Sequence, residues 1–134
     1  MNNITPLIVD RTTKTPQIVF DPLNNIYEIS GRSLPENVVK TYEPVLQWID
    51  QNLGKIHQPL VFNFKLDYLN SASAKMVSLL LTKLEEFYKS GSNIEIRWHY
   101  NLDDDDILSE GEIYAKLKKI PIHLIAINDG ESNE

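Results

Sequence analysis

The sequence predicts a single α/β domain in which a mixed sheet of about five strands carries three main helices. Short runs rich in β-forming residues alternate with longer stretches whose apolar residues recur at helical spacing. In the middle of the chain a strand, a helix and a strand follow one another with short links, which favours a right-handed crossover with parallel strands. The length of 134 residues suits one domain, with an ordered core over about 14–128 and a polar, acidic tail at 129–134.

The first half of the chain predicts a hairpin followed by helical structure. The segment "PQIVFDPLNNIYEISGR" contains two β-rich runs, 18–20 and 26–31, separated by the turn-forming residues Asp, Pro and Asn. Between 45 and 53 the apolar residues fall on one helical face, and Gly54 supplies a stop. Pro44 is expected either to start a second helical segment or to kink a longer helix.

The central crossover is predicted from two apolar strands and the helix between them. The strands are "PLVFNFKL" at 59–66 and "NIEIRWHY" at 93–100, both dense in β-forming residues. The helix covers 73–88 and has a wide apolar stripe. We expect this stripe to bury Leu80 and Leu84 against the sheet.

The remaining elements follow from breakers and periodicity. A helix is predicted from about 107 to 119, where Pro121 prevents its continuation, and "IHLIAI" supplies the last strand. In an open sheet the loops after neighbouring parallel strands meet at one edge. We therefore expect the loops 67–73 and 100–106 to lie side by side.

Composition narrows the class of protein. The chain has 19 acidic and 13 basic residues, a formal net charge of −6, which argues against general nucleic-acid binding. It has no cysteine, and therefore no disulfide framework or thiolate chemistry. No apolar run approaches the ~20 residues that a membrane span needs. We expect a cytoplasmic protein that binds neither nucleic acid nor membrane and whose partners are proteins.

The segment "YLNSASAK" offers more side-chain oxygens than one helix start requires. Asn70, Ser71 and Ser73 are all favoured capping residues, and a single cap is sufficient. A phosphate on Ser71 would lie over the positive end of the following helix, with Lys75 one turn along. Capping and phosphorylation are both compatible with these residues.

A catalytic role for Ser71 is an alternative that finds less support. The segment lacks the Gly-x-Ser-x-Gly pattern that exposes a nucleophilic serine at a sharp turn. The candidate bases are His57 on a connector, His99 on a strand and His123, which we expect in a core strand. None of them is placed by the sequence next to Ser71.

The acidic run "NLDDDDILSEGE" invites a metal-binding interpretation because hard cations prefer clustered carboxylates. Its spacing does not match the calcium-binding loop. Asp103 to Asp106 fit a solvated helix start, since acidic residues complement the helix dipole. A small metal- or serine-dependent hydrolase working between the loops 67–73 and 100–106 is the enzymatic alternative.

Three segments together resemble one family: "TPQIVFDPLNNIYEISGRSLPENVVKTYEPVLQWI", "FKLDYLNSASAKMV" and "IRWHYNLDDDDILSEGE". They are similar, in the same order from Thr15 to Ile127, to the biofilm-regulation phosphoprotein SiaC family. The resemblance implies a non-enzymatic regulator without a cofactor, with a STAS-like fold of the anti-anti-sigma type. It also implies a dedicated protein kinase and a PP2C-like phosphatase as partners. The unphosphorylated form would bind a diguanylate cyclase and promote its activity, thereby controlling cyclic-di-GMP signalling and biofilm formation.

The resemblance also implies a modification site. The phosphorylated hydroxyl belongs to the residue after the Asn of a Tyr-x-Asn motif, here Ser71, where the family more commonly has threonine. An adaptor of the anti-anti-sigma type for another partner is the alternative function. The expected partner or switch surface consists of Tyr68, Asn70, Ser71, Ser73, Lys75, Asp103 and Asp104.

Overall fold

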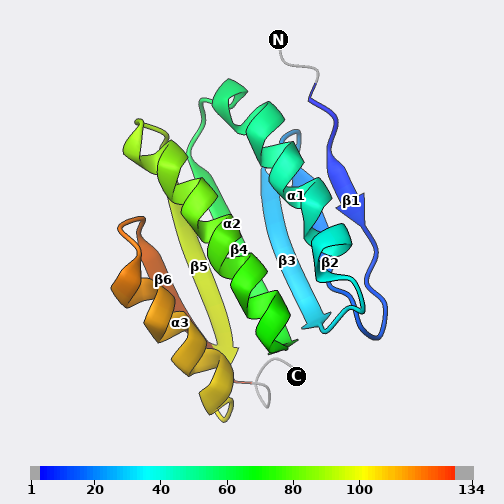
Figure 1. Ribbon diagram of the computed structural model, residues 1–134. Helices are drawn as coiled ribbons and strands as arrows, with labels where there is room; N and C mark the ends of the chain where they lie inside the picture. Colours follow the sequence, from blue (N-terminus) through cyan, green and yellow to red (C-terminus); the bar gives the residue numbers. More distant parts are fainter. Residues whose placement is uncertain (1–3, 129–134) are drawn as a thin grey trace.

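The computed structural model describes residues 4–128 and shows a mixed α/β fold, as the sequence predicts (Figure 1). The elements along the chain are β1 (Leu7–Val9), β2 (Gln17–Asp21), β3 (Ile26–Ser33), α1 (Val38–Asn52), the short 3-10 helix η1 (Leu53–Lys55), β4 (Leu60–Leu69), α2 (Ser71–Lys89), β5 (Ile94–Asn101), α3 (Asp105–Leu117) and β6 (Ile122–Ile127).

The strands form one six-stranded sheet in the order β1-β2-β3-β4-β5-β6. The β1–β2 and β2–β3 pairs are antiparallel, and the other pairs are parallel. The strand beyond the expected five is β1, in the polar lead-in of the chain, where Leu7 pairs with Phe20. The indole N–H of Trp48 donates to the Thr5 carbonyl at 2.8 Å, which ties this segment to α1.

The hairpin and the first helix follow local sequence signals. β2 and β3 pair as predicted, and Asn25 in the turn between them has a positive φ of 56°, a conformation that Asn tolerates. α1 begins after Asn37, whose side chain accepts from the Lys40 N–H at 3.0 Å. Pro44 lies inside this single helix on its exposed side, so it does not start a separate segment.

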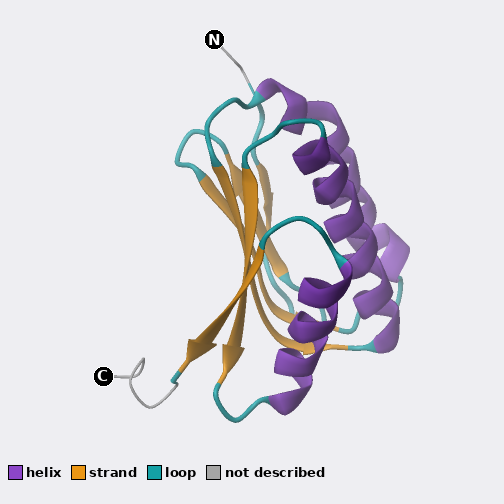
Figure 2. Cartoon of the chain, turned by 90° about the vertical axis from the view of Figure 1, so that its left-hand side faces the viewer, coloured by secondary structure: helices purple, strands orange, loops and turns teal. Residues whose placement is uncertain are grey.

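The central crossover is confirmed. β4 and β5 are parallel neighbours, with Leu60 opposite Ile94 and Phe64 opposite Trp98. The intervening α2 buries Leu80 and Leu84, which are 1% and 0% exposed. α1 and α2 run next to each other over the central strands (Figure 1). Figure 2 shows the helices on one face of the sheet, and the core lies between the helices and this face. No described helix covers the opposite face.

α3 packs closely on β5 and β6. It starts at Asp105, two residues earlier than predicted, because Asp104 caps it. Trp98 Nε1 donates to the Ile107 carbonyl at 2.8 Å. The predicted last strand is present as β6 at the edge of the sheet. The expectation that His123 lies in a core strand is wrong, because its side chain is exposed on this edge strand.

The predicted tail, 129–134, lies outside the described residues. Within residues 4–128, no helix combines the length and the apolar character that crossing a membrane requires.

Candidate functional site

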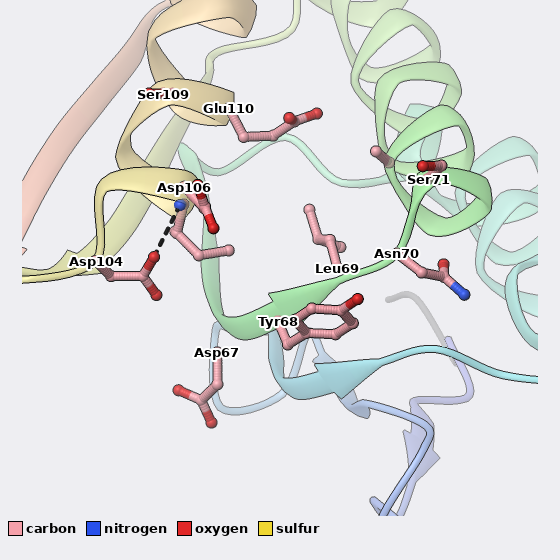
Figure 3. Close-up of a pocket in the computed structure, with 11 residues that line it drawn as sticks. Asp67, Tyr68, Leu69, Asn70, Ser71, Asp104, Asp106, Ser109 and Glu110 are labelled. Atoms are coloured by element: carbon pink, nitrogen blue, oxygen red, sulfur yellow. Dashed lines mark hydrogen bonds between the residues drawn. The ribbon is translucent and has the colours of Figure 1, made fainter.

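The segments 67–73 and 100–106 meet at the carboxyl ends of β4 and β5, as predicted. The first segment is not a loop, because β4 extends to Leu69 and α2 begins at Ser71, so that only Asn70 lies between them. A hollow of about 610 Å³ opens between the start of α2 and the start of α3 (Figure 3). Its walls come from the end of β4, the first turn of α2 and the first turns of α3. The lining residues are Asp67, Tyr68, Leu69, Asn70, Ser71, Ala74, Asp104, Asp106, Ile107, Ser109 and Glu110.

A β-bulge shapes the end of β4. The pairs Gly31 with Leu66 and Arg32 with Tyr68 show that β4 carries one extra residue, Asp67, at this point. Tyr68 therefore lies beside Arg32, whose guanidinium carbon is 5.8 Å from the tyrosine ring centre, and Tyr68 is 47% exposed. Figure 3 shows Leu69 pointing towards the helices and Asp67 pointing away from them.

Asn70 is the residue that caps α2. Its side-chain oxygen accepts from the Ser73 N–H at 2.8 Å, and its carbonyl accepts from the Ala74 N–H at 2.9 Å. Its own N–H donates to the Ser33 carbonyl at 3.0 Å, which ties the cap to the end of β3. Asn70 is thus committed to holding the start of the helix.

Ser71 is the first residue of α2, and its side chain is exposed. The described residues give its hydroxyl no hydrogen-bond partner, since the cap is already supplied by Asn70. The hydroxyl is therefore accessible and structurally uncommitted. Lys75, one turn further along α2, is also exposed but does not line the hollow.

The structure removes Ser73 from the expected surface. Its side chain is 0% exposed and accepts a hydrogen bond from the Ser33 hydroxyl at 2.8 Å. Ser73 is the third residue of α2, and this position turns its side chain towards the sheet and α1 rather than towards solvent. A buried hydroxyl is out of reach of a protein partner.

The acidic residues at the start of α3 divide into two groups. Asp104 caps the helix, because its side chain accepts from the Ile107 N–H at 3.0 Å. Asp106 lies in the first helical turn and lines the hollow with Asp104. Asp103 is exposed and lines a neighbouring hollow, so it is not part of the hollow that Ser71 lines.

The predicted surface omits two polar residues of α3 that line the hollow, Ser109 and Glu110. They follow Asp106 by three and four positions, so helical periodicity places all of them on one face. The Tyr114 hydroxyl lies 2.5 Å from a Glu110 carboxylate oxygen and 3.0 Å from the Ala74 carbonyl, which links α3 to α2. Burial, and then the Glu110 carboxylate, raises the pKa of Tyr114, so this hydroxyl keeps its proton at neutral pH.

The hollow is acidic. Asp104, Asp106 and Glu110 contribute carboxylates from α3 and its cap, whereas the Asp67 side chain points away from the helices, and no Lys or Arg is among the described lining residues. An additional anion on Ser71 would therefore lie near existing negative charge, where repulsion is strongest at low salt.

The three histidines considered as catalytic bases lie away from the hollow. His99 lies on β5, where its Nε2 is 2.9 Å from the Asn63 side-chain oxygen, and His123 Nε2 is 4.0 Å from a Glu95 carboxylate oxygen. His57 is exposed on the connector before β4. No described histidine lines the hollow, and residues 4–128 contain no group of three or more His, Asp or Glu side chains arranged to hold a metal ion.

The fold and the site define an α/β domain that presents an exposed serine hydroxyl on the first residue of a helix, beside an acidic hollow. The model of the SiaC family regulatory phosphoproteins matches residues 9–127. The chain belongs to this family.

Relatives of the chain come from Pseudomonas aeruginosa. An uncharacterized protein of strain UCBPP-PA14 is 28% identical over 120 residues, covering 90% of this chain and 95% of the relative. The crystal structure of apo-SiaC is similar with a TM-score of 0.82 and 29% identity, over 91% of this chain and 99% of that one. SiaC is also present as the activator in a crystal structure with the diguanylate cyclase SiaD, where the TM-score is 0.84 and the identity 28%, over 90% of this chain and 99% of that one.

Proposed function

We propose that this protein is a non-enzymatic regulator whose unphosphorylated form binds and activates a diguanylate cyclase, and that phosphorylation of Ser71 switches this binding off. The observation that carries the proposal is the division of labour at the start of α2. Asn70 caps the helix, whereas the Ser71 hydroxyl is exposed and uncommitted. Membership of a regulatory phosphoprotein family and the likeness to the activator of a cyclase support the same conclusion.

The switch acts through local charge. A phosphate adds about −1.5 to −2 charges at pH 7. At the first residue of α2 this charge is tolerated by the fold, because it lies at the positive end of the helix dipole. It also lies beside the acidic hollow, so the docking surface around Tyr68, Ser71 and Asp104 becomes more negative. A partner that fits the unmodified surface is then repelled without any refolding of the domain.

The proposed cycle needs two further enzymes as partners. A protein kinase transfers a phosphoryl group to the Ser71 oxygen, and a PP2C-like phosphatase returns the hydroxyl by hydrolysis. The protein itself supplies the presentation of Ser71 on a rigid helix start.

The proposal is tested with Ser71→Ala and Ser71→Asp, treated with the kinase and mixed with a diguanylate cyclase from the same organism. Intact mass reports phosphorylation, and the rate of cyclic-di-GMP formation reports activation. We expect the parent to gain one phosphate, Ser71→Ala to gain none and still activate, and Ser71→Asp to activate much more weakly.

Ser109→Ala is the matched control, because Ser109 is an exposed serine of the same hollow. It should be phosphorylated and should activate like the parent. A parent that gains no phosphate, or a Ser71→Ala variant that gains it normally, contradicts the proposal. Phosphorylation without any effect on a cyclase would favour an adaptor for another partner.

A further inference from the structure

Three hydroxyls are buried together beneath the start of α2. Ser33 at the end of β3, Tyr42 in α1 and Ser73 in α2 are each 0% exposed. The Ser33 oxygen lies 2.7 Å from the Tyr42 hydroxyl and 2.8 Å from the Ser73 hydroxyl. A hydrogen-bonded chain thus joins three elements that are far apart in the sequence.

The protons of this chain run in one direction. Ser33 donates to Ser73, and a serine hydroxyl has only one proton to donate. Tyr42 must therefore be the donor to Ser33. Burial raises the pKa of Tyr42, which keeps its proton in place at neutral pH. Ser33 is satisfied as both acceptor and donor, so its hydroxyl has a defined orientation.

Ser33 also contacts the chain on the other side of Ser71. Its carbonyl accepts from the Asn70 N–H at 3.0 Å, while its hydroxyl donates to Ser73. Asn70 and Ser73 are bonded to each other through the helix cap at 2.8 Å. The residue before Ser71 and the residue two positions after it are therefore both held by Ser33.

Such a chain is not needed to fill the core. Alanine at 33 or 73 and phenylalanine at 42 would bury comparable apolar surface without requiring partners, whereas a fully satisfied buried network specifies one geometry. A kinase requires its acceptor oxygen at a defined position, because displacement of a reacting atom by about 1 Å can reduce the reaction rate about 100-fold.

We propose that Ser33 is a positioning residue: through its hydroxyl and carbonyl, with Tyr42 behind it, it fixes the first turn of α2 and thereby the place of the Ser71 oxygen for phosphoryl transfer. The claim about phosphoryl transfer rests on the proposed function of Ser71. The claim that Ser33 fixes the first turn of α2 is independent of that function and is tested separately.

The structural part is tested by amide hydrogen exchange on the full chain. Ser33→Ala removes the hydroxyl and leaves Tyr42 and Ser73 without their shared partner. Within 71–74, the hydrogen-bonded amides are those of Ser73 and Ala74, and we expect their exchange to become about tenfold faster or more, with little change at the carboxyl end of α2. Tyr42→Phe keeps the ring and removes only the first donor, so it should give a smaller change in the same residues.

The matched control is Ile94→Val, a mild core substitution at the opposite end of β5. It lowers global stability without touching the hydroxyl chain, so any acceleration over 71–74 should be no greater than elsewhere in the domain. Unchanged exchange over 71–74 in both Ser33→Ala and Tyr42→Phe overturns the proposal, whatever Ser71 does.

The functional part is tested with the kinase. For Ser33→Ala we expect kcat for phosphorylation of Ser71 to fall about tenfold or more, with KM nearly unchanged, and we expect Ile94→Val to behave like the parent. An equal loss in both variants would show a general effect of instability and would contradict positioning. If the parent protein is not phosphorylated, the proposed function of Ser71 is wrong. Hydrogen exchange still determines whether Ser33 holds the start of α2.

Discussion

Asn70 and Ser71 are neighbours that carry out different tasks. Asn70 makes hydrogen bonds within the fold. Its side-chain oxygen accepts from the Ser73 N–H, and its backbone N–H donates to the Ser33 carbonyl. Ser71 has an exposed hydroxyl without a described partner. The sequence predicted that one of the surplus oxygens caps the helix, and Asn70 confirms this. It did not show that Ser73 is buried, because the direction of that side chain depends on how α2 packs.

His99 provides a test of electrostatics at the scale of one side chain. Burial, then the positive charges of Lys65 and Arg97, lower the pKa of His99 below its ordinary value of 6.5, against the opposing effect of Glu28. The unfolded chain therefore binds this proton more readily than the folded protein. Stability should decrease as the pH falls below about 6.5, and the decrease should continue down to the lowered pKa of the folded state.

The measurement is the free energy of unfolding in denaturant between about pH 7.5 and pH 5.5. His99→Gln, which can keep a bond to Asn63, should have a flatter pH dependence than the parent. His123→Gln is the control on the same face of the sheet. If His99→Gln retains the full slope of the parent, the account of His99 is wrong.

α3 depends on one glycine to reach the sheet. A Cβ on Gly111 would lie 2.3 Å from Trp98 Cδ1 and 2.8 Å from Leu124 Cδ2, both far closer than van der Waals contact. The helix lies against β5 and β6 because this position has no side chain. This contact also sets the position of Asp106 and Glu110 in the hollow.

We expect Gly111→Ala to destabilise the protein by about 1–3 kcal/mol through overpacking. This occurs although alanine is the better helix former by about 1 kcal/mol. Ser109→Ala, an exposed substitution on the same helix, should change stability by less than about 0.5 kcal/mol. Chemical denaturation measures both, and a Gly111→Ala variant as stable as the parent would show that α3 can move away from Trp98 without cost.

The elements of the fold that the sequence predicts best are those with long periodic patterns. The parallel crossover over 59–100 is confirmed, and α2 buries Leu80 and Leu84 as predicted, because burial and local preference agree there. The ends differ: β4 continues to Leu69, α2 begins at Ser71, and Leu79 of the predicted stripe is exposed. β1 is too short to show a period, and its strand character comes from pairing with β2. The sequence predicts His123 in a core strand, whereas β6 is an edge strand. A short apolar run has the same composition in a central strand and in an edge strand.

At the scale of the whole molecule, the topology creates the site. Parallel β4 and β5 end at the same edge, and helices α2 and α3 both begin there on the same face of the sheet (Figures 1 and 2). The strand–helix–strand order with short links predicts this meeting of loops, because such a crossover makes the two strands parallel. The bulge that turns Tyr68 towards Arg32 arises from the pairing of β3 with β4, two strands whose register no local pattern specifies.

We expect a phosphate on Ser71 alone to separate this protein from a diguanylate cyclase. Calorimetry measures the affinity of a diguanylate cyclase from the same organism for the unmodified protein and for protein that carries phosphoserine incorporated at position 71 during synthesis. Phosphoserine at the exposed Ser90, at the far end of α2, is the control for added charge. We predict tight binding of the unmodified protein and of the Ser90-modified protein, and at least about a tenfold loss, equivalent to about 1.4 kcal/mol, for the Ser71-modified protein. Equal affinity of all three forms would show that phosphorylation of Ser71 does not control binding of the cyclase.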